Sequence, residues 1–529
     1  MAVSLTLSAI CFGQSNNLVN AYSPGQYEID MRTTPAQITV RIPLETIEDQ
    51  IRNAVLEGNS SSPDLTLKLN RGQFVNVMPG SPNLGLSIHV DGTLKNAGGE
   101  SFQCKLDFDF AVPANPIFDA TTQVLSTNSV CSFSGELAKL LGLERLLEGL
   151  LHDAVNMALN RTSGSDGKSG KELAALTKSD PRLANLLQRG RLQGQYCSSP
   201  RWPRALCLHI SWQTLDFENY FFNLRAFAPQ PSGISANPES AKQLAQQFSA
   251  AGALYPFGAN FSFPTKRLAD GQLDDGDALI FNGLLCLSGL PLGCETVKAA
   301  QDGGGRFWRS PHLVGSTAQN PFSGDQLKGA IGYFIAQGDA VNFSRFLQFL
   351  RSNMVLIPSP TNPIYQGYKS CTNDVSNTCL VGSSDWLWLT NIAEKLAVTS
   401  ELPAATLDPE VRAWYTPDAL VWEAAFTPLG YRTHLVGIAI LFAQKIGLQG
   451  VQFKDAAAIL ASRQPHNPFF LYLHLGKDEI VANELAKKCD LNASQSAFDQ
   501  WAWEREESES AWKTSMRWDC TFMYSLLSR

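Results

Sequence analysis

Charged residues are scarce in this chain of 529 residues. Asp, Glu, Lys and Arg together make up 17%, while hydrophobic residues make up 44%. This composition argues against intrinsic disorder and against a coiled coil. The formal net charge is -7, and the sequence contains no Lys/Arg cluster. Because phosphate contacts need a basic surface, we expect no nucleic-acid partner.

Several motifs of known chemistry are also missing. There are 7 histidines, none of them in an HExxH motif, and there is no GxSxG motif. Metalloprotease and α/β-hydrolase interpretations therefore lose their main support. The cysteines form no CxxC and no zinc-like Cys-His spacing. The carboxylates of segment 274–277 do not fit the EF-hand spacing, so calcium is conceivable but unsupported and no cofactor is predicted.

Long apolar runs are missing too. The best run, from Leu435 to Phe442, is far shorter than the roughly 20 residues that cross a bilayer, so we expect no transmembrane segment. The apolar start, from Met1 to Gly13, has no positive region and no small-x-small cleavage site, which makes it a poor signal peptide. We interpret it as the beginning of a mature domain from which an export signal has been removed.

Cysteine is plentiful, with 11 residues. Several lie in close pairs that flank turns, which is typical of disulfides in an oxidising compartment. We therefore expect a secreted or periplasmic protein, or one associated with the envelope; buried free thiols are the alternative. The sequence alone leaves the connectivity open. The pairs that we favour are Cys104 with Cys131, Cys197 with Cys207, Cys286 with Cys294, Cys371 with Cys379, and Cys489 with Cys520.

Residues 1–163 change period twice. Alternation over 38–42 predicts a strand, and helical spacing follows over 44–58. Further alternation predicts strands over 65–69, 84–90 and 102–110, and a Leu-rich amphipathic helix runs from about 136 to 159. We expect an α+β domain in which an antiparallel, curved sheet carries two long helices.

This order of elements resembles the tubular lipid-binding (TULIP-like) domains. The resemblance covers residues 1–163 and is one of pattern, without a diagnostic motif. It implies that a lipid or acyl chain lies between helix and sheet. The alternative is that the second helix simply fills the core.

Residues 164–234 form a linker and a disulfide hairpin. The segment begins rich in Gly and Ser, which is typical of an exposed loop. Strand-like segments over 192–197 and 206–212 then predict a hairpin.

Residues 235–529 show helical periods instead of alternation. Segment 323–326 has the pattern of a capping box, and Pro417 and Gly447 are typical helix boundaries. The expected helices begin near Pro238, Asp277, Glu295, Ser323, Ala340, Ser384, Pro409, Pro417, Tyr431, Lys454 and Asp478. This all-α pattern resembles the (α/α) toroid of carbohydrate-active enzymes, with an irregular helical domain as the alternative.

The loops of this region carry carboxylates beside aromatic residues. Hydrolysis of a glycosidic bond needs two carboxyl groups, one as acid and one as base or nucleophile. We predict Asp277, Asp325 and Glu423 as catalytic residues. The competing interpretation is that an Asp at a helix start only caps the helix.

Substrate contacts are predicted beside these carboxylates. Trp308 and Trp386 are candidates for stacking on sugar rings, with Arg309 and Asp385 next to them. Tyr431 and His434 share a helix face at positions i and i+3, where a lyase would need a base.

We therefore predict a secreted or envelope protein that acts on a polysaccharide or oligosaccharide, as a glycoside hydrolase with paired carboxylates. The alternative is a non-catalytic lipid-binding or envelope interaction protein. A polysaccharide lyase is the second alternative.

Overall fold

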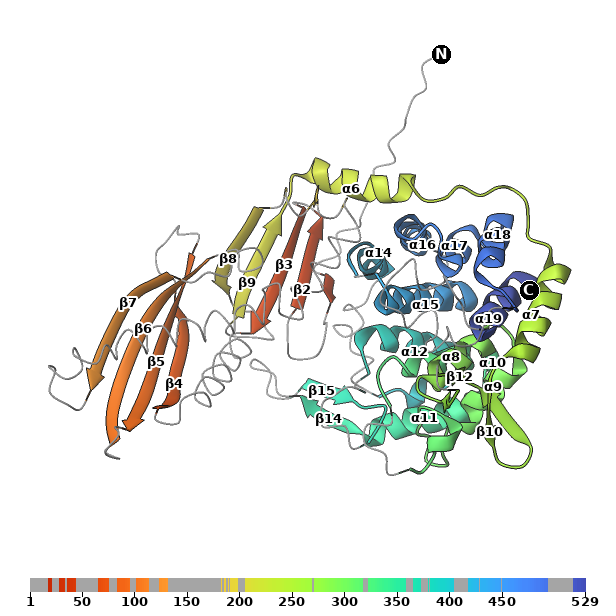
Figure 1. Ribbon diagram of the computed structural model, residues 1–529, viewed down its shortest axis with the longest axis horizontal. Coiled ribbons are helices and arrows are strands. Elements are labelled where there is room, and N and C mark those ends of the chain that lie inside the picture. The colour runs from red at the N-terminus through yellow and green to blue at the C-terminus, as the bar shows by residue number, and fades with distance from the viewer. Residues whose placement is uncertain are drawn as a thin grey trace, which may run out of the picture. The chain divides into compact units, whose positions relative to one another are not determined.

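A computed structural model of the chain is shown in Figure 1. It describes strand segments between residues 18 and 131, residues 182, 185, 186, 189 and 191–197, and residues 205–529 except 269–270, 317–321, 358–364, 373–378, 380, 404–416, 428, 449 and 493–516. The chain divides into two units. One is Met1–Glu218 with Ser359–Asn362, and the other is Asn219–Pro358 with Pro363–Arg529.

The first unit contains two antiparallel sheets. One has the order β1-β2-β3-β9-β8 and the other has the order β4-β5-β6-β7. Their strands are β1 (Leu18–Asn20), β2 (Glu28–Thr33), β3 (Ala36–Pro43), β4 (Leu65–Val75), β5 (Asn83–Lys95), β6 (Ser101–Pro113), β7 (Gln123–Cys131), β8 (Arg191–Cys197) and β9 (Ala205–Ser211).

Strands β3, β4, β5, β6, β8 and β9 cover the segments where alternation predicts strands, whereas β1, β2 and β7 are not predicted; the strands are divided between two sheets. Strands β4 to β7 form a meander, in which each strand pairs with the next. The hairpin β8-β9, which the sequence places in the linker, pairs with β3, so that Val40 lies opposite Leu208. The helices expected over 44–58 and 136–159 lie outside the described residues, so the α+β class and the lipid site of residues 1–163 stay predictions.

The second unit is helical and has an inner set of helices. All ten residues of α8 are buried, and most residues of α15, α17 and α19 are buried as well. Helices that are apolar all round pack in the interior of a domain. The inner helices are α8 (Ala278–Leu287), α10 (Leu327–Gln337), α12 (Ser383–Lys395), α15 (Tyr431–Ile446), α17 (Pro468–Leu475) and α19 (Arg517–Ser528).

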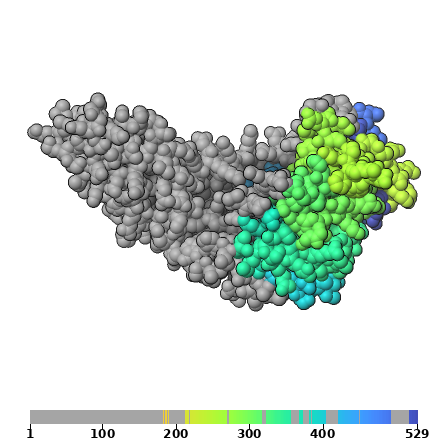
Figure 2. Space-filling view, turned by 90° about the horizontal axis from the view of Figure 1, so that it is seen from below, coloured from red at the N-terminus to blue at the C-terminus, as the bar shows by residue number. Residues whose placement is uncertain are grey.

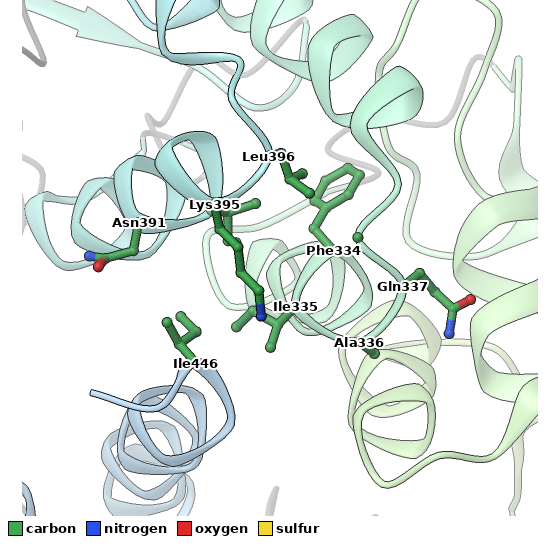
Figure 3. A pocket seen from close by; sticks show the side chains of 10 residues that line it. Phe334, Ile335, Ala336, Gln337, Asn391, Lys395, Leu396 and Ile446 are labelled. Atoms are coloured by element: carbon green, nitrogen blue, oxygen red, sulfur yellow. The ribbon is translucent and has the colours of Figure 1, made fainter. Parts of the chain in front are cut away.

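The inner helices run in the same direction. At their starts, Gln326 before α10 bonds to Asp277 before α8 (Nε2 to Oδ1, 2.6 Å), and Lys328 of α10 pairs with Asp385 of α12 (3.2 Å). At their other ends, the final residues of α10, α12 and α15 line one cavity of about 240 Å³ (Figure 3).

Asn467 before α17 likewise bonds to His434 in the first turn of α15, and Gln444 near the end of α15 bonds to Leu473 near the end of α17. Arg529 after α19 bonds to Gly289 just after α8. Because starts meet starts and ends meet ends, the inner helices are parallel and their N-terminal ends share one side of the unit.

The inner helices also close on themselves. The ring of Phe522 on α19 lies 5.7 Å from Phe469 on α17 and 6.4 Å from Phe281 on α8. Helix α19 also packs against α7, the first helix of the unit, and Figure 1 shows the two side by side.

The remaining helices form an outer layer. Helix α11, for example, buries only Phe343, Phe346, Leu347 and Leu350, which lie on one face. Figure 2 shows one face of this unit, formed by the segments coloured from yellow-green to cyan. The outer helices are α7 (Pro238–Ala251), α9 (Pro291–Ala299), α11 (Ala340–Ser352), α14 (Pro417–Phe426), α16 (Val451–Arg463) and α18 (Glu479–Lys488). The other elements are α6 (Thr214–Ala226), the 3-10 helices η1 (Pro311–Leu313) and η2 (Thr399–Glu401), and the strand pairs β10 (Leu254–Phe257) with β11 (Phe261–Pro264), β12 (Lys266–Arg267) with β13 (Leu273–Asp274), and β14 (Met354–Ile357) with β15 (Tyr365–Tyr368).

Helices α8 and α10 touch through their backbones. A Cβ atom on Gly283 would lie 2.2 Å from the carbonyl oxygen of Gly329, and one on Gly329 would lie 2.2 Å from that of Leu279. No side chain fits at either position. The close crossing brings the first turns of α8 and α10 together.

Helix boundaries match the sequence in part. Helices begin at Pro238, Ala340 and Tyr431, as expected. The capping box predicted over 323–326 is wrong, because α10 begins at Leu327 without a side-chain cap. The helix expected near Pro409 lies outside the described residues. Helices α17 and α19 were not predicted, although Asn467 before a Pro is a capping signal for α17.

Disulfides join Cys286 to Cys294, Cys371 to Cys379 and Cys489 to Cys520, with Cα–Cα distances of 4.5, 5.9 and 5.9 Å. These are pairs that the sequence favours. In the strands of the first unit, the register puts Cys104 opposite Cys131. Cys197 lies opposite Ala205, two pairs away from Cys207, which lies opposite Gln195. Bonds between these four cysteines stay predictions. In the part of the chain that the structure describes, no helix is both long and apolar enough to cross a membrane.

Candidate functional site

A group of polar side chains lies at the N-terminal ends of α8 and α10. It combines the segment before α8, the loop that leads to η1, and the segment before α10. We call this group the carboxylate cluster. Its members are Asp275, Asp277, Arg309, Ser310, His312, Ser323, Asp325 and Gln326.

Asp277 is the centre of the carboxylate cluster. Its Oδ1 accepts hydrogen bonds from Arg309 Nη1 at 2.7 Å and from Gln326 Nε2 at 2.6 Å. Its backbone is left-handed, with φ 57°, and its side chain does not cap α8. Non-glycine residues seldom adopt this conformation. The simple capping interpretation of Asp277 is therefore wrong.

Asp325 joins the same network through Ser323. The other guanidinium nitrogen of Arg309, Nη2, donates to Ser323 Oγ at 3.0 Å, and Ser323 Oγ donates in turn to Asp325. A continuous path of hydrogen bonds thus links the two predicted catalytic carboxylates. Arg309 is the bridge between them.

A second branch begins at Asp275. Its Oδ2 accepts a hydrogen bond from Ser310 and lies 3.0 Å from His312 Nδ1. The neighbouring Asp274 instead accepts from the backbone of Gly276 and pairs with Lys266. The carboxylates of segment 274–277 thus face different partners. Within the described residues, no group of three or more His, Cys, Asp and Glu side chains is arranged to hold a metal ion.

The carboxylate cluster is accessible to solvent. The side chains of Asp277 and Arg309 are 24% and 25% exposed, and that of His312 is 48% exposed. The nearby ion pair of Lys328 with Asp385 is more enclosed, with exposures of 12% and 8%. Asp385 also accepts from the backbone N–H of Gly382, which caps α12. A substrate can thus reach the first set of charges more readily than the second.

The two tryptophans predicted to stack on sugars are buried. Trp308 is 4% exposed and Trp386 is 7% exposed. The guanidinium of Arg306 covers the ring of Trp308 at 3.8 Å, and Trp386 packs edge-on against Tyr368. Neither ring offers an open face, so the structure gives their stacking role no support.

Tyr431 and His434 both lie on the first turn of α15 but have different surroundings. Tyr431 is 37% exposed, whereas His434 is fully buried. His434 Nδ1 donates to the carbonyl of Gly430 (3.0 Å), and its Nε2 accepts from Asn467 (3.1 Å). Burial lowers the pKa of His434 to about 4. Both nitrogens of this neutral imidazole are engaged in the interior, where a base cannot reach a polymer.

Glu423 lies on the outer helix α14, outside the path that joins Asp277 to Asp325 through Arg309 and Ser323. It is partly exposed on α14, and that helix packs mainly against α15 and α16. The structure therefore brings together Asp277, Asp325 and Arg309, but not Glu423.

Sequence reasoning missed Ser310, His312, Ser323 and Gln326 as members of the site. A signal for them was present. Segments 278–287 and 327–336 are largely apolar, which predicts interior helices. Polar residues just before two interior helices come together if the helices are parallel.

A search against protein-family models, curated proteins and solved structures returned no match for this chain. The functional argument therefore depends on the geometry of the carboxylate cluster.

Proposed function

We propose that the chain hydrolyses glycosidic bonds, with Asp277 and Asp325 as the carboxyl pair. The observation that carries this proposal is the path from Asp277 through Arg309 and Ser323 to Asp325. It joins two partly exposed carboxyl groups that come from different segments. Such a pair is what glycoside hydrolysis requires.

The surrounding side chains hold the pair in place. Arg309 donates through two different nitrogens, one toward each carboxylate branch, and charge-assisted bonds of this kind are directional. We assign Asp277, which is ion-paired with Arg309, as the base, and Asp325, whose partner is a neutral hydroxyl, as the acid. Fixed orientation of reacting groups is itself a large part of catalysis.

The charge balance favours a neutral sugar as substrate. Arg309 is paired with Asp277, and Lys328 is paired with Asp385. A lyase that acts on uronates needs a cation to neutralise the substrate carboxylate, and it needs an accessible base. These two cations are already balanced, and His434 is buried, so the hydrolase is the better supported of the two enzymes.

The helix arrangement supports the toroid-like interpretation of residues 235–529. Parallel inner helices alternate along the chain with outer helices, and the last inner helix packs on the first. The disulfides of the helical unit support a secreted or periplasmic location, because such bonds persist in oxidising compartments.

Substitution of the carboxyl pair tests the proposal. In the full-length protein, we expect Asp277→Asn and Asp325→Asn each to lower the release of reducing ends from neutral polysaccharides by at least about 100-fold. The melting temperature should change little, because exposed ion pairs stabilise proteins weakly.

The matched control is Asp455→Asn. Asp455 forms an Arg–Asp pair of the same kind with Arg225, at 2.9 Å and with side chains 25% and 30% exposed. This variant should keep full activity. Equal activity in all three variants, or no activity in the unmodified protein on any neutral polysaccharide, would contradict the proposal.

A further inference from the structure

The β10-β11 hairpin has one face made of aromatic rings. In its antiparallel register, Tyr255 lies opposite Phe263 and Phe257 lies opposite Phe261. Residues opposite each other, and residues two apart on a strand, share a face of the ribbon. Figure 1 shows this hairpin, labelled β10, at the edge of the helical unit.

The rings of this face form a continuous surface. Tyr255 and Phe263 are stacked with ring centres 5.1 Å apart, and Phe257 meets Phe261 edge-on at 6.2 Å. Phe263 is 0% exposed and anchors the hairpin to the domain. The rings of Tyr255, Phe257 and Phe261 remain partly exposed. The aromatic face is therefore only partly exposed, less than Leu254 and Pro256 on the opposite face, and it extends from a fixed base.

This aromatic face continues into the carboxylate cluster. The ring of Tyr255 stacks on the imidazole of His312, with centres 5.2 Å apart and planes inclined by 29°. His312 is held by Asp275 through Nδ1 at 3.0 Å. Arg309, which bridges the two carboxylate branches, comes directly before the 3-10 helix η1, and His312 lies within η1. Direct contact therefore links the hairpin to the loop that carries the proposed reaction.

We propose that this aromatic face binds the sugar rings of a neutral oligosaccharide next to the bond that is cleaved. This inference rests on the proposed function. One face of a pyranose ring carries C–H bonds, which pack on the surface of an aromatic ring, while its hydroxyl groups stay in water. Phe257 and Phe261 supply the ring surface for the sugar, and Tyr255, whose ring is stacked on Phe263 and His312, joins them to the carboxylate cluster. The hairpin takes the role that the sequence assigned to Trp308 and Trp386.

Self-packing of the rings is the competing explanation, because cross-strand aromatic pairs stabilise a short hairpin. Binding and stability separate the two explanations. Tyr255→Leu and Phe257→Leu keep apolar contact across the ribbon but remove the flat surface. Leu254→Ala is the control, since Leu254 is 40% exposed on the opposite face of the same strand.

The experiment measures binding of cellohexaose, xylohexaose, chitohexaose and maltohexaose to the full-length protein by calorimetry. An Asp325→Asn background prevents turnover. We expect at least one of these to bind, and we expect Tyr255→Leu and Phe257→Leu to weaken that binding by about five- to tenfold each. Leu254→Ala should change it less than about twofold.

The outcomes separate this inference from the proposed function. Suppose that Tyr255→Leu and Phe257→Leu bind the sugar unchanged and that the protein with Asp325 intact hydrolyses it. This result overturns only the proposal that the aromatic face binds sugar. If binding depends on these rings but the protein with Asp325 intact cleaves no sugar, the binding role of the aromatic face is supported and the proposed hydrolysis is overturned. If none of the hexasaccharides binds, the proposal that the aromatic face binds neutral sugars is overturned. A lower melting temperature without weaker binding assigns the rings to self-packing.

Discussion

At α8 and α10, the helix starts carry charged side chains that solvent reaches, whereas at α15 and α17 the starts carry a neutral and fully buried network. Asp277 and Arg309 represent the first region, with about a quarter of each side chain exposed. His434 and Asn467 represent the second, with exposures of 0% and 2%. Both regions lie at the same end of parallel helices and place polar residues near helix starts. The two regions share a position in the fold but differ in solvent access and charge, and this difference makes the region at α8 and α10 the candidate site.

The largest effect is expected from a substitution that disrupts the buried network of His434 and Asn467. Asn467 caps α17 through the N–H groups of Phe469 and Phe470, and it also donates to His434. Asn467→Ala removes the cap and leaves a buried imidazole nitrogen without its donor. We expect the free energy of unfolding to fall by about 3 kcal/mol, measured by denaturant titration. Hydrolysis per folded molecule should not change; a loss of hydrolysis larger than the loss of folded protein would place this network in the site.

The pH dependence of stability sharpens the same comparison. The folded pKa of His434 is about 4, below its ordinary value of 6.5. Between pH 6.5 and pH 4, the unfolded chain takes up a proton at this position that the folded chain refuses, so stability falls as the pH falls. The free energy of unfolding is unaffected by His434 above pH 6.5, and protonation of His434 in the unfolded chain lowers it by up to about 3 kcal/mol at pH 4.

The difference between the unmodified protein and His434→Gln isolates this contribution. The glutamine is neutral at every pH, so its unfolding curves should depend less on pH between 4 and 6.5. Parallel pH profiles for the two proteins would show that His434 is not the group responsible.

A smaller change tests how the charged region is assembled. Gly283→Ala places a methyl group against the backbone of Gly329 and pushes α8 away from α10. Overpacking of this kind costs about 2 kcal/mol. Because Asp277 and Gln326 precede these two helices, we also expect hydrolysis to fall by more than the folded fraction does.

Gly303→Ala is the control for that substitution. An added Cβ at Gly303 meets nothing within 4 Å, so both the melting temperature and hydrolysis should be unchanged. If Gly283→Ala folds and hydrolyses normally, the glycine contact does not set the geometry of the carboxylate cluster.

Much of the local structure follows from sequence patterns. Alternation locates strands β3, β4, β5, β6, β8 and β9 of the first unit, and the apolar segment after Asp277 forms a buried helix. Disulfides between Cys286 and Cys294 and between Cys371 and Cys379 follow from their short spacing. These features depend on neighbours along the chain, which a sequence displays directly.

The composition of the carboxylate cluster was predictable only in part. Asp277, Asp325 and Arg309 were candidates, but so were Glu423, Trp308 and His434, which the fold places elsewhere or buries. A polar residue at a helix start has the same sequence signature whether it caps, fills the core or faces a substrate. The sequence therefore indicates candidate residues but does not separate these cases.

The sequence by itself determined the composition that argues against a nucleic-acid partner, the close spacing of several cysteines, and the division between alternating and helical regions. Only the tertiary structure decided that α8 and α10 cross at two glycines, that Arg309 bridges Asp277 and Asp325, and that Tyr255 stacks on His312. The physical reason is distance along the chain. Local patterns fix each helix or strand, whereas contacts between residues tens of positions apart depend on how whole elements pack.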